Sequence, residues 1–259
     1  VSAAASEEMV KIATTKEAGL MFVEFFANSL LWGMLALFLL SRGDERLRRP
    51  FIMLSIIALL SALVADLGHI LLKAHELAVL HQSGFSEAFS LYVHTTAGFA
   101  TILRALALAV GAAGVAMFGF RSVRGTAAIL IPALAVFAYF RAIVSHATAN
   151  PFHPGLSIAV NFIHVIEKDL WLGLLAVLCV LFFMRPNAAR EYVHGVVNLL
   201  SANLAVLAVS AGYIVWLHLR SFDNLASTAW GQAAIPLFAA ALALVVVHAS
   251  IVLLGRYRA

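Results

Sequence analysis

The chain has 259 residues, of which 63% are hydrophobic and only 12% are charged. A soluble domain of this size needs more charged side chains to cover its surface. The mean hydropathy of +0.98 therefore indicates a helical membrane protein rather than a water-soluble one. The net charge of +4 comes from arginines in short segments between apolar runs, which argues against nucleic-acid binding. The single cysteine, Cys179, excludes an intrachain disulfide and a paired-thiolate metal site.

Apolar stretches long enough to cross a bilayer recur along the chain. A crossing helix needs about 20 apolar residues, and lipid offers no partner to open backbone groups. We therefore predict an all-α polytopic transmembrane bundle of about seven spans, preceded by an external N-terminal segment at 1–18, with 19–259 as a single domain. The predicted spans are 19–41, 50–73, 93–120, 125–146, 158–184, 192–218 and 231–254.

The basic residues predict the orientation of this bundle. Arginines concentrate in the first, third and fifth connections and in the C-terminal tail, all on one side of the predicted membrane. They are Arg42, Arg46, Arg48, Arg49, Arg121, Arg124, Arg185, Arg190, Arg256 and Arg258. The positive-inside rule assigns that side to the cytoplasm. The sequence thus predicts a multi-pass protein of the bacterial inner membrane, with the N-terminus outside and the C-terminus in the cytoplasm.

Ionisable side chains within the spans are concentrated in the external half of the predicted bundle. Each costs about 2.5–3.5 kcal/mol near the membrane centre and usually marks function. These residues are Glu24, Asp66, His69, His94, Arg104, Arg141, His146, His164 and Glu167. The cytoplasmic half is poorer, with His194, Asn198 and Ser201 on one face and His248 in the last span. The external half is therefore where we expect the functional site.

Four histidines at similar depth on four predicted spans indicate a shared site. They are His69, His94, His146 and His164. Imidazole is a ligand for copper and for haem iron. Asp66 or Glu167 would orient one imidazole through its second nitrogen. The alternative for any one of these histidines alone is a hydrogen-bonded structural residue.

Three stretches in the second half resemble a known family. SHATA (Ser145–Ala149) and NFIHVIEKDLWLGLL (Asn161–Leu175) are similar to motifs of the CopD (PcoD-type) copper-resistance membrane family. The last stretch, which resembles that family's closing helix, is STAWGQAAIPLFAAALALVVVHASIVLLGRYR (Ser227–Arg258). The resemblance covers the chain from about Arg141 onward. It implies an inner-membrane protein that handles copper and carries it from the periplasm toward the cytoplasm.

Three positions of this chain match the family's motifs, and two features depart from the family's pattern. The resemblance carries over His146, His164 and Trp171, of which the last two lie seven residues apart in a hydrophobic helix. The family usually has Gly where this chain has Ser145. The six methionines are scattered and form no thioether ladder for Cu(I).

Three functions remain open from the sequence. In the first, external copper would pass His153 and bind among the four histidines. In the second, two histidines would ligate haem b, with Arg104 or Arg141 pairing with propionates while electrons pass between a quinol and a periplasmic partner. In the third, the chain is a cofactor-free subunit of a larger membrane complex, and Arg104 forms a structural ion pair with Asp66 or Glu24.

An enzyme is not expected. The sequence has no Gly-rich phosphate loop, no HExxH motif and no nucleophile in a recognisable activated setting. We expect transport or electron transfer instead. The expected partners are the lipid bilayer, a periplasmic metal or electron carrier protein, and the other subunits of a membrane complex.

Overall fold

The computed structural model describes residues 3–145 and 153–219, and single positions at 227, 228, 232, 235, 239, 242 and 246. Residues 3–145 and 153–219 form seven α-helices and contain no strand, which confirms the all-helical prediction for this part of the chain. The helices are α1 (Ala3–Leu40), α2 (Glu45–His81), α3 (Phe85–Val93), α4 (Thr96–Phe118), α5 (Val123–Ile143), α6 (Pro154–Met184) and α7 (Pro186–Leu219).

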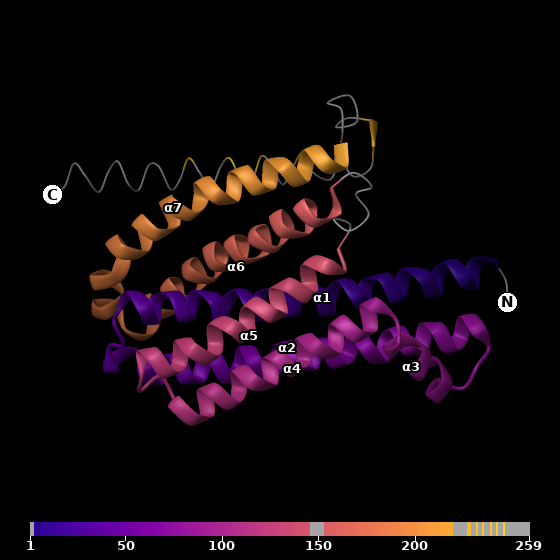
Figure 1. Cartoon of the computed structure of the whole chain (residues 1–259), viewed down its shortest axis with the longest axis horizontal. Helices are drawn as coiled ribbons and strands as arrows, with labels where there is room; N and C mark the ends of the chain where they lie inside the picture. Colours follow the sequence, from indigo (N-terminus) through magenta and orange to yellow (C-terminus); the bar gives the residue numbers. More distant parts are fainter. Residues whose placement is uncertain are drawn as a thin grey trace.

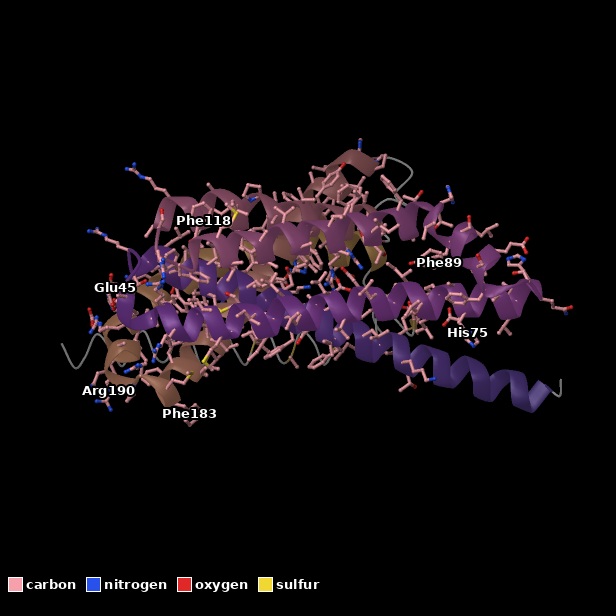
Figure 2. The ribbon with its side chains drawn as sticks, turned by 90° about the horizontal axis from the view of Figure 1, so that it is seen from below. Glu45, His75, Phe89, Phe118, Phe183 and Arg190 are labelled. Carbon is pink, nitrogen blue, oxygen red and sulfur yellow. The ribbon has the colours of Figure 1, made fainter. Side chains whose placement is uncertain are left out.

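The long helices lie side by side along the longest axis of the molecule (Figure 1). The turns between α1 and α2, α4 and α5, and α6 and α7 all lie at one end, on the left in Figure 1. We call this the basic end, because eight arginines lie in or beside these turns: Arg42, Arg46, Arg48, Arg49, Arg121, Arg124, Arg185 and Arg190. Helix α3 lies at the opposite end, which we call the α3 end. Figure 2 shows Glu45 and Arg190 at the basic end, and His75 and Phe89 at the α3 end.

Five helices are long and apolar enough to cross a membrane, counted over the described residues. They are 15–40, 45–81, 96–118, 123–143 and 186–217. Helix α6 has 31 residues but carries three consecutive charged side chains, Glu167 to Asp169, near its middle. It packs along α1 and α7. The predicted seventh span, 231–254, lies outside the described residues apart from five single positions.

Local sequence signals explain where the helices begin and end. Asp44, Thr95 and Ser122 cap α2, α4 and α5, each accepting a hydrogen bond from a backbone N–H of the first turn. Gly119 ends α4 in the left-handed conformation, with φ of 47°. Pro154 is the first residue of α6, where its missing N–H costs nothing.

The connection at 74–92, which the predicted spans 50–73 and 93–120 leave between them, is mostly helical rather than a loop. Helix α2 continues to His81, and α3 follows from Phe85. Residues 74–81 are rich in Ala and Leu and contain no Gly or Pro, so nothing stops the helix before Gln82, which has φ of 52°. Helix α2 is about 55 Å long at 1.5 Å per residue, well beyond a hydrocarbon core of about 30 Å.

Helix α1 is the centre of the bundle. In its most apolar stretch 67% of the residues are buried, and it packs against α2, α5, α6 and α7. Near the basic end the core is aromatic: the rings of Phe38, Phe51 and Phe120 have centroids 5.0–6.1 Å apart. The polar side chains of α1 lie further towards the α3 end, and there they form the candidate site.

Candidate functional site

Four charged side chains from four helices meet inside the bundle. Arg104 of α4 donates through Nη2 to Asp66 Oδ1 of α2 at 2.7 Å, and lies 3.4 Å from Glu24 Oε2 of α1. Arg141 of α5 donates through Nη1 to Glu24 Oε1 at 3.0 Å. Asp66 is fully buried, and Glu24 is only 4% exposed. Glu24 therefore bridges two guanidinium groups with its two carboxylate oxygens.

A second polar group lies between α1 and α6, one turn further towards the basic end on α1. The Asp169 carboxylate, which is fully buried, accepts hydrogen bonds from Asn28 Nδ2 and, at 3.2 Å, from Ser29 Oγ. Lys168 Nζ lies 3.7 Å from Asp169 Oδ1. This carboxylate is thus held by two neutral donors of α1 and one cation of its own helix.

The ring of Phe25 connects the two groups. Lys168 Nζ lies 4.3 Å from the ring centroid, and the guanidinium carbon of Arg141 lies 6.0 Å from it. Both distances fit cation–π contacts. We call the combined set the ionic layer, which consists of Glu24, Asp66, Asp169, Arg104, Arg141 and Lys168 together with Asn28 and Ser29. It holds three carboxylates and three cationic side chains, so its formal charges balance.

Charge balance is what makes this layer tolerable inside an apolar bundle. An unpaired charge is very costly there. Removing one partner of a buried ion pair leaves such a charge and typically costs about 3–5 kcal/mol. Three buried atoms of the layer, Asn28 Oδ1, Asp66 Oδ2 and Arg104 Nε, have no hydrogen-bond partner among the described residues. The layer links α1, α2, α4, α5 and α6, so it also fixes how these helices pack.

A third cluster lies towards the α3 end. Lys73 Nζ contacts Glu17 Oε2 at 2.6 Å and Glu76 Oε2 at 3.0 Å, and all three side chains are about one quarter to one third exposed. His69 lies one turn from both Asp66 and Lys73 on α2 and is partly buried. Polar side chains therefore extend along α1 from Glu17 to Ser29, which corresponds to roughly 18 Å of helix.

The face between α6 and α7 is polar as well. His164 Nδ1 lies 3.1 Å from Ser210 Oγ of α7. One turn later on α6, the Glu167 carboxylate accepts a hydrogen bond from Asn203 Nδ2 of α7. The imidazole and the carboxylate thus point to the same neighbouring helix at i and i+3.

A hydrogen bond joins this face to the end of α5. Asn161, one turn before His164, donates through Nδ2 to Ser145 Oγ at 2.7 Å. Ser145 directly precedes His146, which lies outside the described residues. Two of the three segments that carry the resemblance to the CopD family are therefore in contact at Ser145 and Asn161.

The four predicted histidines are not gathered into one group in the part that is described. His94 is exposed, and its Nδ1 lies 2.6 Å from the Ser90 carbonyl oxygen of its own helix α3. His69 lies on α2 and His164 on α6. Among the described residues there is no group of three or more His, Cys, Asp or Glu side chains that could hold a metal ion. The four-histidine site stays a prediction, because His146 lies outside them.

The charged residues of the predicted site have protein partners. Asp66 binds Arg104 rather than an imidazole, and Arg104 and Arg141 bind carboxylates. The structural ion pair considered for Arg104 is present with both Asp66 and Glu24. Trp171 is 6% exposed, and its Nε1 has no partner within the described ranges.

Two members of the ionic layer on α6, Lys168 and Asp169, are not among the predicted site residues. Asp169 is nevertheless fully buried. The sequence feature that indicates this polar contact is the four-residue spacing of Glu24 and Asn28, which puts two polar groups on one face of α1. A polar face on α1 needs polar partners, and α6 supplies one of them.

No protein-family model matches the chain, and no curated protein and no solved structure matches it either. Its function therefore has to be argued from the arrangement of its own residues.

Proposed function

We propose that the chain is a multi-pass membrane protein that binds a transition-metal ion where α5 ends and α6 begins. By its resemblance to the CopD family, the metal is copper and the role is copper transport or homeostasis. The observation that carries this proposal is the position of His164 and Glu167, one turn apart on α6 and each hydrogen-bonded to α7. The ion would lie beside the ionic layer, not within it.

The donor set fits a metal ion in part. An imidazole and a carboxylate one turn apart on a helix face resemble the Glu-x-x-His pattern used for metals in helical bundles, here in the reverse order. Because His164 Nδ1 faces Ser210, Nε2 is the ring atom directed to a ligand. Nitrogen and oxygen donors favour Cu(II) over Cu(I). His146, next to Ser145, is the candidate for a third ligand. A bound copper ion would be either the transported cargo or a redox centre.

Helices α1, α2 and α4 are apolar between the ionic layer and the basic end, which supports entry of the metal ion from the α3 end only. After Glu24, Asp66 and Arg104, no ionisable residue follows towards the basic end within 25–41 of α1, 50–65 of α2 or 105–120 around α4. Each segment covers about 24 Å of helix. This arrangement supports a site served from the α3 end.

We place the basic end in the cytoplasm and the α3 end outside, because the positive-inside rule favours arginines on the cytoplasmic side. The C-terminal region at 231–254 adds the seventh span in this proposal. The membrane is the bacterial inner membrane, and the protein that delivers the metal is a periplasmic carrier. Subunits of a larger complex are the other expected partners.

The haem alternative has weaker support. It assigned Arg104 and Arg141 to propionates, yet both guanidinium groups are already compensated by Glu24 and Asp66. A propionate would compete with buried carboxylates for the same donors. The absorption spectrum of the purified protein separates the two cases, because haem gives a Soret band and copper alone does not.

Metal analysis of the purified, detergent-solubilised chain tests the proposal. After incubation with Cu(II) and desalting, the wild type should retain copper in a defined ratio. His164→Ala should retain at least about tenfold less, and Glu167→Gln should weaken binding to a smaller degree.

His94→Ala is the matched control, because this histidine is exposed and contacts its own helix. It should bind copper like the wild type. Equal copper retention by His164→Ala and the wild type, with both correctly folded by thermal unfolding, contradicts the proposal. A Soret band that disappears in His164→Ala would move the assignment to haem.

A further inference from the structure

A groove lies between α2 and α4, running from the basic end to Leu63, one turn before Asp66. It encloses a cavity of about 400 Å³, within the range of small-molecule sites in proteins. Its wall is apolar and includes Ile56, Leu60 and Met117, which are about half exposed or more. Arg48 and Arg121 lie at its end. The groove therefore combines an apolar channel with two cationic groups.

The backbone around Gly119 sets the position of both arginines. Arg48 Nε donates to the Gly119 carbonyl oxygen at 2.9 Å, which holds the guanidinium beside the α4–α5 turn. Gly119 and Phe120 both have positive φ, 47° and 55°. The turn buries the Phe120 side chain in the core and leaves Arg121 exposed at the mouth of the groove.

These two arginines also differ from their neighbour Arg46, which has two counterions. Within the described part of the chain neither Arg48 nor Arg121 takes part in an ion pair, whereas Arg46 contacts Asp44 at 2.7 Å and Glu191 at 2.8 Å. The fixed Arg48 guanidinium keeps its terminal N–H groups for another acceptor. The two arginines thus form a preset site for an anion.

We propose that this groove binds an anionic phospholipid. The phosphate contacts Arg48 and Arg121, and one acyl chain lies along Ile56, Leu60 and Met117. Guanidinium groups pair well with phosphate, and basic pockets between transmembrane helices bind anionic headgroups. A soluble anion would gain nothing from the apolar wall, so the combination fits a lipid.

Native mass spectrometry of the whole chain in detergent tests this proposal. The probes are phosphatidylglycerol, phosphatidylcholine of the same acyl chains, and glycerol phosphate, which has the anion without the chains. The wild type should retain phosphatidylglycerol over phosphatidylcholine and should not retain glycerol phosphate. In Arg48→Gln/Arg121→Gln, affinity for phosphatidylglycerol should fall on the order of 20-fold, about fivefold for each arginine.

The control is Arg124→Gln/Arg190→Gln, which removes the same charge at the same end but outside the groove. It should bind phosphatidylglycerol like the wild type. Ala116→Trp, a substitution at an exposed wall residue, should block the acyl chain with both arginines present. Equal loss in both double variants, or equal retention of the two lipids by the wild type, overturns the proposal. Strong retention of glycerol phosphate would also overturn it, because the site would then be for a soluble anion.

Discussion

Gly33 of α1 and Gly173 of α6 bring the two helix backbones into direct contact. A Cβ added at Gly33 would lie 2.1 Å from the carbonyl carbon of Gly173, and one added at Gly173 would lie 1.7 Å from the Ser29 carbonyl oxygen. Asp169 lies one turn before Gly173, where it reaches Asn28 and Ser29. The close approach of two glycines is therefore what brings the α6 carboxylate into contact with α1.

We expect Gly173→Ala to destabilise the protein, because the clash is with backbone atoms that cannot move aside. Overpacking of this kind costs about 1–3 kcal/mol or more, and small residues are what allow close helix approach in membranes. Thermal unfolding in detergent should show a clearly lower midpoint. Gly19→Ala, on the partner helix α1, is the control, since a Cβ there meets nothing within 4 Å. It should be neutral or slightly stabilising, and a wild-type midpoint for Gly173→Ala would contradict the packing.

Asp66 and Arg104 should be energetically coupled. Asp66→Asn leaves Arg104 with one less counterion, and Arg104→Gln leaves Asp66 without a counterion and Glu24 with Arg141 alone. Each single substitution should cost about 3–5 kcal/mol. The double variant should be more stable than the sum of the two losses implies, by about 0.5–3 kcal/mol. The measurement is a double-mutant cycle on the free energy of unfolding in mixed micelles.

The matched cycle pairs Asp66→Asn with Arg46→Gln, whose guanidinium lies at the basic end and binds Asp44 and Glu191. These two losses should simply add within about 0.5 kcal/mol. If the Asp66 and Arg104 losses also add, the buried ion pair does not operate in the folded protein.

The sequence predicts the helices of this bundle better than it predicts the polar contacts. Apolar length and caps such as Ser122 depend on neighbouring residues only, so most helix positions can be read directly. The α2–α3 region is an exception, because polar residues near a membrane suggest a loop although Ala74 to His81 favour a helix. Asp169 reaches its partners because α1 and α6 cross at Gly33 and Gly173, which are 140 residues apart in the chain. The sequence around either glycine does not identify the other as its contact.

The candidate site shows the same limit. Glu24, Asp66, Arg104 and Arg141 can be identified as buried charges from their positions in apolar spans. Four histidines at similar depth predict a shared site, but depth gives no information on which side of its helix each ring lies. The neighbours of a buried charge are fixed by helix rotation, and only the packed structure defines that rotation.

Asp44 should contribute a pH-dependent part of the stability at the basic end. The hydrogen bond from the Arg46 side chain is the main cause that lowers the Asp44 pKa to about 2, and Tyr192 OH and the Arg46 backbone N–H add to it. The folded pKa lies below the unfolded value of about 3.9. The stabilisation is therefore fully present above about pH 4 and is lost as the pH falls towards 2.

Comparison of the wild type with Asp44→Asn isolates this contribution, since Asn can still cap α2. The difference in unfolding midpoint should be constant near neutral pH and should shrink between about pH 4 and pH 2. Tyr192→Phe should reduce that difference in part, because it removes the 2.7 Å hydrogen bond to Asp44 Oδ2. Glu87→Gln, at an exposed position of α3, is the charge-matched control. A pH-independent difference for Asp44→Asn would show that its charge is not involved.

Cysteine labelling tests the proposed orientation of the bundle. In a Cys179→Ser background, Ser86→Cys introduces a thiol at the α3 end, and Asn187→Cys introduces one at the basic end; both positions are exposed. Because the positive-inside rule places the arginine-rich turns in the cytoplasm, a membrane-impermeant maleimide added to intact cells should label only the Ser86→Cys variant. The Asn187→Cys variant should be labelled only after the cells are permeabilised. The opposite pattern would put the ionic layer on the cytoplasmic side, and a periplasmic metal carrier could then no longer serve the site at His164.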